Sequence, residues 1–463
     1  MRAFIHGFRR RHMQTRPRAG TVLVITAVIL IALVGMLGLV IDAGQLMTAH
    51  RKTQNAADAA ATAAAMDMIA GGSNGTATTT AVTFVHDYNG LPGATVVVHI
   101  PPTSGPHAGN AQYVEVIVTN PFTVRFIQVV GISPSQTVTA RAVAGREGVA
   151  VTAGVIALDR DARPGVNLTG NGTLKVNGTI LVNSDGGGLA ANGQPIANGN
   201  SGTAITTSGN GKIYALDVQS VGGVSDITKI KNYNTSIAQS PLHTSTVIQS
   251  DPYQMLPPPT TANGAVSTFY GAVKLSGNAS VTLSPGVYTS LDLSANVDVF
   301  MNPGIYVILG GGLSMSGNST LSGERVMLYN TGSNYNVSTG LPDSGDGTSL
   351  PPAPGNPTFG SVEITGNAAI NLTPYTNSSS PFDGMVLYQR RLNPMPLKLA
   401  GNGSSDVLSG TVYAKWAPLD LSGNGTFNSQ FVVQRVEISG NGTLVLDVAG
   451  QHLAQSELVF LVE

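Results

Sequence analysis

The chain contains no cysteine and little charge. Of its 463 residues none is Cys, one is Trp, and 11% are charged, whereas soluble domains have roughly 25% charged residues. The absence of Cys excludes disulfides, thiolate metal sites, cysteine nucleophiles and iron–sulfur clusters. Residues 1–20 carry six Arg and no acid, so the basic charge is concentrated at one end. Because a nucleic-acid-binding protein spreads its basic charge over a folded domain, the sequence predicts no nucleic-acid partner.

An apolar run follows the basic end. Residues 21–41, TVLVITAVILIALVGMLGLVI, carry no charge, and as a helix they are about 32 Å long, enough to cross a hydrocarbon core of about 30 Å. The apolar part of a cleaved secretory signal is about 7–15 residues long, so the run favours an uncleaved anchor over a cleaved signal, which is the alternative. The Arg residues precede the run and acids begin at Asp42. The positive-inside tendency therefore predicts a single-pass inner-membrane protein with a cytoplasmic N-terminus and residues 42–463 outside.

The residues beyond the span favour a continuing helix. Residues 42–70 are rich in Ala and contain no Pro, and because Ala is the best helix former we expect the helix to continue to Gly71 and Gly72. Its face of small residues permits close packing. Two interpretations stay open, a plain stalk or a surface that packs on partner helices.

Three strings around the span resemble a known family. They are Ala19-Gly20, Ile41-Asp42-Ala43-Gly44 and Gln54-Asn55-Ala56-Ala57-Asp58-Ala59-Ala60. Over about residues 15–145 the chain resembles TadE/TadG-like proteins of the bacterial Tad (Flp) pilus-assembly systems. The resemblance implies a membrane-anchored component whose partners are membrane lipid and other Tad/Flp machinery membrane proteins.

The sequence departs from related families at two points. The residue five after Gly20 is Ile25, where type IV prepilins carry Glu, so whether Gly20 is a processing site stays open. The chain has no Asp-x-Ser-x-Ser string, which the von Willebrand A-like domain of some TadG proteins needs for its metal. That domain and its metal are therefore not implied.

Residues 73–147 are expected to form a small pilin-like α+β unit. Their composition predicts a helix over 78–89 and strands over 94–100, 112–119 and 136–143, with 122–130 either helical or extended.

From residue 148 the composition shifts towards Gly, Asn, Ser and Thr. A motif of a small residue, Gly and Asn recurs, with its Asn at Asn171, Asn210, Asn278, Asn318, Asn367, Asn402, Asn424 and Asn441. Because Gly and Asn tolerate positive φ, the motif predicts corners between short strands, and Asn side chains stacked at these corners are expected to form hydrogen-bonded ladders. The expected strands are 173–176, 280–283, 297–301, 305–309, 326–329, 361–364, 385–388 and 443–446. The irregular spacing favours a parallel β-solenoid with surface loops at 220–259 and 330–357, and a β-sandwich is the alternative fold.

The same region offers little catalytic chemistry. Glycosidases need two carboxylates about 5–10 Å apart, but the acids here are scattered, no Asp-Asp occurs, and the His in the middle of the region is His243. The string Asp343-Ser344-Gly345-Asp346-Gly347 resembles part of a calcium loop and lacks the closing Glu. We interpret Arg390-Arg391 as a solvated turn and His50-Arg51-Lys52 as interfacial groups. The sequence thus predicts no catalytic, cofactor-binding or metal-binding residues, no cofactor and no enzyme activity.

These observations predict a membrane-anchored α+β part followed by an all-β part. The expected segments are a basic cytoplasmic tip (1–20), a transmembrane helix (21–41), a helix extension (42–72), a pilin-like unit (73–147) and a Gly/Asn-rich β-solenoid (148–463). The predicted function is a structural component associated with Tad/Flp-type pilus assembly or secretion. The alternatives are a surface adhesin or carbohydrate-binding protein on a signal anchor, with a surface glycan as its partner, and a polysaccharide-degrading β-helix enzyme.

Overall fold

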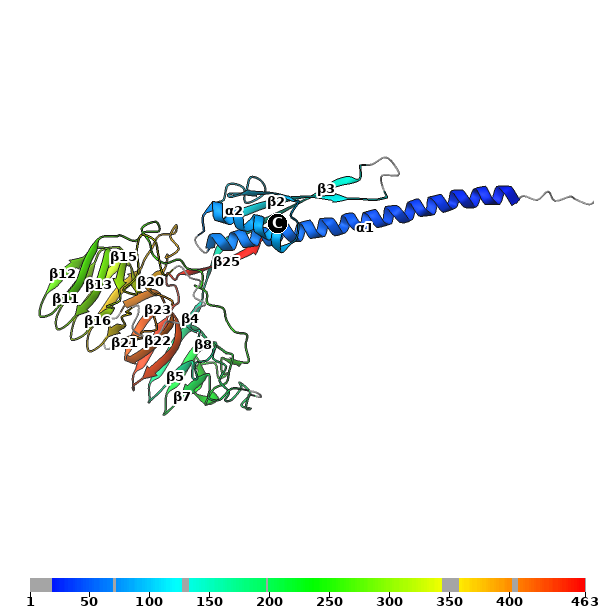
Figure 1. The fold of residues 1–463 in the computed structure, drawn as a ribbon. Coiled ribbons are helices and arrows are strands. Elements are labelled where there is room, and N and C mark those ends of the chain that lie inside the picture. The colour runs from blue at the N-terminus through cyan, green and yellow to red at the C-terminus, as the bar shows by residue number, and fades with distance from the viewer. Residues whose placement is uncertain are drawn as a thin grey trace, which may run out of the picture. The chain divides into compact units, whose positions relative to one another are not determined.

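The computed structural model divides into two units (Figure 1). It describes residues 19–69, 72–126, 133–196, 199–343, 358–401 and 407–462. The N-terminal unit comprises residues 1–68, 72–146 and 459–463, and the parallel-sheet unit comprises residues 69–71 and 147–458.

The predicted span and its extension form one uninterrupted helix, α1 (Ala19–Ile69), of 51 residues. Its last described residue is Ile69, so the helix continues through the Ala-rich segment as predicted. The apolar side chains of its first half lie exposed, for example Leu23 at 72% and Ile31 at 73%. Its most apolar stretch has a mean hydropathy of 3.0 and is 6% buried, so the helix is long and apolar enough to cross a membrane.

The rest of the N-terminal unit is a four-stranded sheet with a second helix. Ser73 caps α2 (Asn74–Thr83) by accepting a hydrogen bond from the backbone of Thr76, and the helix continues as a π-helical turn, η1 (Phe84–Tyr88). It thus begins earlier than the predicted 78–89. The sheet order is β1-β2-β3-β25, with β1–β2 and β2–β3 antiparallel. The strands are β1 (Thr95–His99), β2 (Tyr113–Thr123), β3 (Ser135–Ala150) and β25 (Gln455–Leu461).

All three strands predicted for this unit are present, and the structure adds a fourth. Of the ambiguous segment 122–130, Phe122 and Thr123 are extended, and residues 127–130 lie outside the described residues. The fourth strand, β25, returns from the far end of the chain, where the Val462 amide donates to the Val143 carbonyl at 2.9 Å. The predicted segment 148–463 did not include this return, because a short apolar strand does not indicate which sheet it joins.

The second sheet contains 21 strands, and every ladder between its named strands in the described residues is parallel. Parallel pairing is unlike the antiparallel sheets of a β-sandwich. A 3₁₀ turn, η3 (Ile227–Lys229), precedes β9. The strands are β4 (Ala153–Ala157), β5 (Val166–Leu168), β6 (Thr173–Val182), β7 (Ile205–Thr207), β8 (Lys212–Ser220), β9 (Ile230–Asn232), β10 (Leu242–Thr244), β11 (Phe269–Leu275), β12 (Ser280–Leu283), β13 (Gly286–Leu293), β14 (Asp298–Met301), β15 (Gly304–Leu309), β16 (Leu313–Met315), β17 (Thr320–Thr331), β18 (Val362–Ile364), β19 (Ala369–Pro374), β20 (Met385–Gln389), β21 (Leu397–Gly401), β22 (Val407–Gly423), β23 (Gly425–Ser439) and β24 (Thr443–Asp447).

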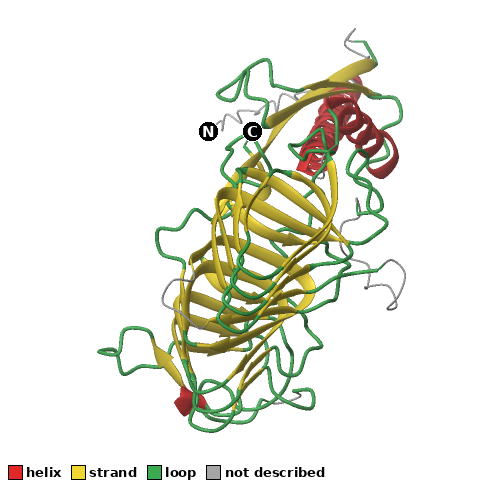
Figure 2. Ribbon diagram, turned by 90° about the vertical axis from the view of Figure 1, so that its left-hand side faces the viewer, coloured by secondary structure: helices red, strands yellow, loops and turns green. Residues whose placement is uncertain are grey.

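The pairings of this sheet follow three parallel ladders, and the long strands bend from one ladder into the next. Ladder A contains the column Tyr329, Tyr388 and Tyr413. Ladder B contains the column Glu363, Lys398, Asp420 and Glu437. Ladder C contains the column Val299, Leu321 and Ile370. The strands stack like rungs in the view of Figure 2.

The chain enters and leaves this unit in the middle of the stack. β4 pairs with β6 on one side and with β23 on the other. From β4 the chain runs outward to β10, crosses through residues 245–268 to β11, and returns strand by strand until β23 and β24 meet β4, β5 and β6. The order of the strands in space is therefore not their order in the sequence.

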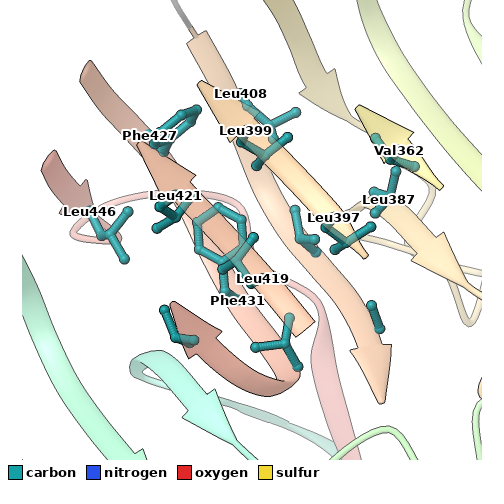
Figure 3. Close-up of a cluster of buried hydrophobic side chains, with 14 of the residues drawn as sticks. Val362, Leu387, Leu397, Leu399, Leu408, Leu419, Leu421, Phe427, Phe431 and Leu446 are labelled. Atoms are coloured by element: carbon teal, nitrogen blue, oxygen red, sulfur yellow. The ribbon is translucent and has the colours of Figure 1, made fainter. Parts of the chain in front are cut away.

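A continuous apolar core runs inside the three ladders. Strand β6 shows the pattern, since its residues alternate between buried and partly exposed. The core includes the residues labelled in Figure 3: Val362, Leu387, Leu397, Leu399, Leu408, Leu419, Leu421, Phe427, Phe431 and Leu446. A void of about 10 Å³ lies within this core, between apolar side chains that include Val362, Leu387 and Leu408.

Candidate functional site

The second half of α1 is a buried face of alanines. Six of them are 0% exposed: Ala56, Ala57, Ala60, Ala61, Ala64 and Ala65. They share one core cluster with Val114, Val116 and Val118 of β2 and with Ala140, Ala142 and Ala144 of β3. Small side chains allow the helix to approach the sheet closely, so the string that marked the family resemblance forms the core of the N-terminal unit.

The interpretation that residues 42–70 pack on partner helices is therefore wrong for the alanine face. The chain's own sheet already covers it, and an Asp at Ala57, Ala60 or Ala64 would disrupt the unit rather than test an interface. The spacing of small residues predicts close packing but not the identity of the packing partner. The apolar stretch 22–41 of α1 is exposed apart from Gly38, and further along the helix residues such as Met47, His50 and Met66 are exposed as well.

Asp42 joins α1 to residues 124–126, which follow β2 directly and are called the hairpin end below. One of its carboxylate oxygens accepts a hydrogen bond from the Arg125 amide at 3.2 Å and the other accepts from the Phe126 amide at 2.8 Å. The side chain is 2% exposed. Gly38, one turn earlier, faces the same hairpin, because a Cβ built there lies 2.8 Å from the Cβ of Phe126. In the sequence Asp42 served only to orient the span, and its place in the Ile-Asp-Ala-Gly string was the signal that could have revealed it.

Glu115 is the second polar centre of the N-terminal unit and is 0% exposed. Its carboxylate accepts hydrogen bonds from Arg141 Nε at 2.6 Å, from the Thr103 amide at 3.0 Å, and from the hydroxyls of Thr103 and Ser104 at 2.7 and 2.9 Å; His99 Nδ1 lies 2.9 Å away. Burial opposes ionisation, but the hydrogen bonds from Thr103, Arg141 and Ser104 outweigh it and hold the pKa of Glu115 well below its usual range. The network ties β1, β2, β3 and residues 103–104 together.

The three basic residues beyond the span, His50, Arg51 and Lys52, are exposed on α1. Lys52 Nζ donates to the Gly90 carbonyl at 3.2 Å. Their interfacial role stays a prediction.

The Gly-Asn motifs stack on one another at one corner of the parallel-sheet unit. Asn296 donates to Asn278, Asn318 to Asn296, and Asn367 to Asn318, at 3.0, 2.9 and 3.2 Å. The predicted Asn ladder is thus confirmed for this stretch.

The stacking continues through backbone amides at the place where the returning strands β23 and β24 pair with β5 and β6. The Asn171 amide lies 3.4 Å from Asn441 Oδ1, and the Asn210 amide lies 3.3 Å from Asn171 Oδ1. Asn296 stands outside the Gly-Asn motifs because Ala295 takes the place that Gly has in the others, and Ala295 adopts the same positive φ, 65°. Asn402 lies outside the described residues.

A segment predicted as a surface loop instead covers the tyrosines on the outside of ladder A. Within the crossover, Asp251 accepts a hydrogen bond from the Tyr413 hydroxyl at 2.7 Å, and the buried Tyr253 hydroxyl donates to Gln430 at 2.8 Å. Tyr388 is 1% exposed, and burial raises its pKa to about 12. Residues 251–265 therefore pack against the sheet and are called the strap below. Their aromatic and Pro residues cover a surface that a solvated loop would leave exposed.

Arg390 and Arg391 are covered in part by residues 251–265. The interpretation of this Arg pair as a solvated turn is wrong. The two residues are 4% and 5% exposed. Arg390 Nε lies 2.5 Å from an Asp343 oxygen, and Arg391 donates to the Tyr388 hydroxyl at 2.8 Å and to the Leu256 carbonyl at 2.7 Å. Burial raises the pKa of Asp343 even though Arg390 opposes that shift. A solvated turn was expected because sequence alone does not show that a strap covers these residues.

Asp343, the first residue of the calcium-like string, thus belongs to a buried ion pair, and residues 344–347 lie outside the described residues. Asn330 and Thr331 were also predicted to begin a surface loop, yet both are 0% exposed at the end of β17. Within the described parts of the chain, no group of three His, Asp or Glu side chains could hold a metal ion.

The scattered acids of the sequence partly converge on the outer face of ladder B. Asp420 pairs with Glu437 on the next strand and with Lys398 on the previous one. Burial, followed by the charge of Glu437, raises the pKa of Asp420, and Lys398 and Arg435 offset part of the shift. His243 lies elsewhere, on β10, with Nε2 3.5 Å from Asp217. The structure therefore places the two carboxylates on neighbouring strands, whereas His243 lies on a different strand.

Comparison with known proteins finds one related segment. Residues 20–67 match the Tad family model, described as putative Flp pilus-assembly TadE/G-like. No curated protein matches the chain, and no solved structure matches it. The resemblance to TadE/G-like proteins is thus confirmed for a segment that coincides with α1. The family match includes all six buried alanines and ends two residues before the helix ends at Ile69.

Proposed function

We propose that this protein is a structural component of a Tad/Flp-type pilus-assembly or secretion system, anchored once in the inner membrane with its N-terminus in the cytoplasm. The observation that carries the proposal is the TadE/G-like match over residues 20–67. That match covers both the exposed apolar half of α1 and most of the half that forms the core of the N-terminal unit. One helix would thus serve as the anchor and as the folding template of the first extracytoplasmic unit.

The proposal includes an extracytoplasmic β-solenoid formed by the parallel-sheet unit. Three observations support a solenoid: the three parallel ladders, the apolar core within them and the Asn side chains stacked at one corner. A body of this kind repeats short coils, and each coil contacts mainly its neighbours. Its proposed role is mechanical, to present a stiff surface outside the membrane rather than to catalyse a reaction.

Membrane topology tests the anchor. Because the chain contains no Cys, a single Cys placed at Tyr88, which is 74% exposed, can be labelled selectively. In intact spheroplasts a membrane-impermeant maleimide should label Tyr88→Cys fully, and should label Arg9→Cys only after permeabilisation. Labelling of both before permeabilisation, or of neither, contradicts the proposed orientation.

In-cell photo-crosslinking tests the assembly role. A photoreactive amino acid at Leu23 or Leu30, both exposed on α1, should crosslink to a membrane protein of the Tad machinery. The same group at Tyr88 is the matched exposed control outside the span. Crosslinks that never include a Tad component, together with retention of the full-length protein on a surface glycan, would favour the adhesin. Turnover of an acidic polysaccharide by the full-length protein, abolished by Glu437→Gln, would favour the enzyme.

A further inference from the structure

We propose that the hairpin end, residues 124–126 directly after β2, lies in the headgroup region of the lipid bilayer, where Asp42 of α1 holds it. The N-terminal unit would then contact lipid at a second place besides the anchoring helix. This inference rests on the proposal that α1 crosses the membrane.

The depth of the hairpin follows from its contact with α1. The uncharged apolar run ends at Ile41, and Gly38 lies about 4.5 Å inside that end at about 1.5 Å per residue. Phe126 packs directly on Gly38, whose missing side chain leaves the space. A bilayer that covers the run as far as Ile41 therefore also reaches Phe126.

The exposed surface of Phe126 continues the apolar surface of the helix. Phe126 is 43% exposed, and the neighbouring α1 residues Leu37 and Ile41 are 64% and 40% exposed. Aromatic side chains gather at membrane–water interfaces, where their apolar rings lie at the level of the headgroups. The chemistry of this surface therefore suits a lipid bilayer.

Asp42 removes the main cost of placing a hairpin end at this depth. Backbone N–H groups that lose water without gaining an acceptor carry a large desolvation penalty. The amides of Arg125 and Phe126 instead donate to the two carboxylate oxygens of Asp42. Because Gly38 and Asp42 are four residues apart, they lie on the same face of the helix, one accommodating the Phe126 ring and the other accepting the amides.

Spin-label depth measurements test the proposal. We would prepare the full chain with a nitroxide at Phe126→Cys, Leu30→Cys or Tyr88→Cys and reconstitute it in vesicles of phosphatidylcholine and phosphatidylglycerol. Relaxation by oxygen, which concentrates in lipid, is compared with relaxation by a water-soluble nickel chelate. The oxygen-to-nickel ratio should be highest at Leu30, lowest at Tyr88, and at Phe126 several-fold above Tyr88. Arg125→Cys repeats the measurement one residue away and leaves the Phe126 contact intact.

The calibrating positions separate the two proposals. A Phe126 ratio equal to that of Tyr88, with Leu30 deep in lipid, overturns the hairpin placement and leaves the anchor standing. A Leu30 ratio equal to that of Tyr88 overturns both. Adding Gly38→Leu to the Phe126→Cys chain should displace the hairpin and lower its ratio towards the Tyr88 value, and an unchanged ratio would show that contact with Gly38 does not set the depth.

Discussion

At the scale of single residues, the buried carboxylate of Glu115 holds together several segments of the N-terminal unit. Its neighbours supply hydrogen bonds from two strands and from Thr103 and Ser104. Glu115→Gln should lower the free energy of unfolding of this unit by about 2–4 kcal/mol, because the amide cannot accept all of these donors. Faster hydrogen exchange of the β2 amides measures the loss. Asp87→Asn, at an exposed site, is the control, and an equal effect there would refute the assignment.

The lowered pKa of Glu115 also fixes the sign of a pH dependence. A carboxyl whose folded pKa lies below its ordinary value of 4.5 contributes stability above that value and loses it as the pH falls towards the folded pKa. The wild-type unit should therefore lose stability below about pH 5, and the Glu115→Gln unit should show a smaller loss.

The pH dependence of stability that Asp420 contributes has the opposite sign to that of Glu115. Its pKa is raised from its ordinary value of 3.8, so its ionisation lowers stability once the pH rises through the folded pKa. Asp420→Asn should stabilise the β22–β23 pairing at pH 7.5 by a few tenths to about 1 kcal/mol, since the site is partly open to solvent. The gain should vanish near pH 3.5, when the wild-type carboxyl is protonated. Hydrogen exchange at both pH values measures it, and a gain of the same size for Asp298→Asn would count against this explanation.

At the scale of elements, the stacked corner depends on glycines that face backbone. Gly317 and Gly277 both have positive φ, 72° and 84°. A Cβ at Gly317 lies 2.8 Å from backbone atoms of Ala295, whereas a Cβ at Gly277 meets nothing within 4 Å. Gly277→Ala should therefore cost about 1 kcal/mol from conformation alone and Gly317→Ala about 3 kcal/mol. Chemical denaturation measures both, and equal losses would mean that stacking contributes nothing.

The buried face of α1 gives a second prediction at this scale. Ala64→Asp places a charge at a site that is 0% exposed and should unfold the N-terminal unit, since an unpaired buried charge costs several kcal/mol. Met66→Asp, at a site that is 54% exposed, should leave the unit folded. Circular dichroism and proteolysis of the full chain in detergent distinguish the two. A folded Ala64→Asp chain that had only lost a partner would restore the interpretation that we reject.

The sequence predicted the positions of the strands better than the contacts between residues that are distant in sequence. All eight strands expected in the Gly/Asn-rich region overlap observed strands, because apolar alternation and Gly-Asn corners are local signals. The strap at 251–265, the buried pair Asp343–Arg390 and the Asp42 junction were missed, because each depends on a contact between residues distant in sequence. Local patterns likewise could not show that Asn171 stacks on Asn441.

At the scale of the whole molecule, residues 245–268 connect two groups of strands, β4–β10 and β11–β24. The sheet already holds these two groups together. β23 pairs with β4 and β5, and β24 pairs with β6. A protease site inserted after Val247, which is 80% exposed, should be cut without separating the two fragments. Size-exclusion chromatography of the cut full-length protein should show one species that dissociates only in denaturant. Separate fragments under native conditions would mean that the β4–β23 pairing is too weak to join the two groups.

The return of β25 to the N-terminal sheet also governs the order of events during biosynthesis. At translation rates of about 5–20 residues per second, residues 455–461 emerge tens of seconds after β3. Throughout that interval β3 lacks its outer neighbour and β4 lacks β23, so both present unpaired edges that invite aggregation. A prematurely terminated chain lacking β23 to β25 would leave both units unfinished, and degradation of incomplete copies would follow from the topology itself.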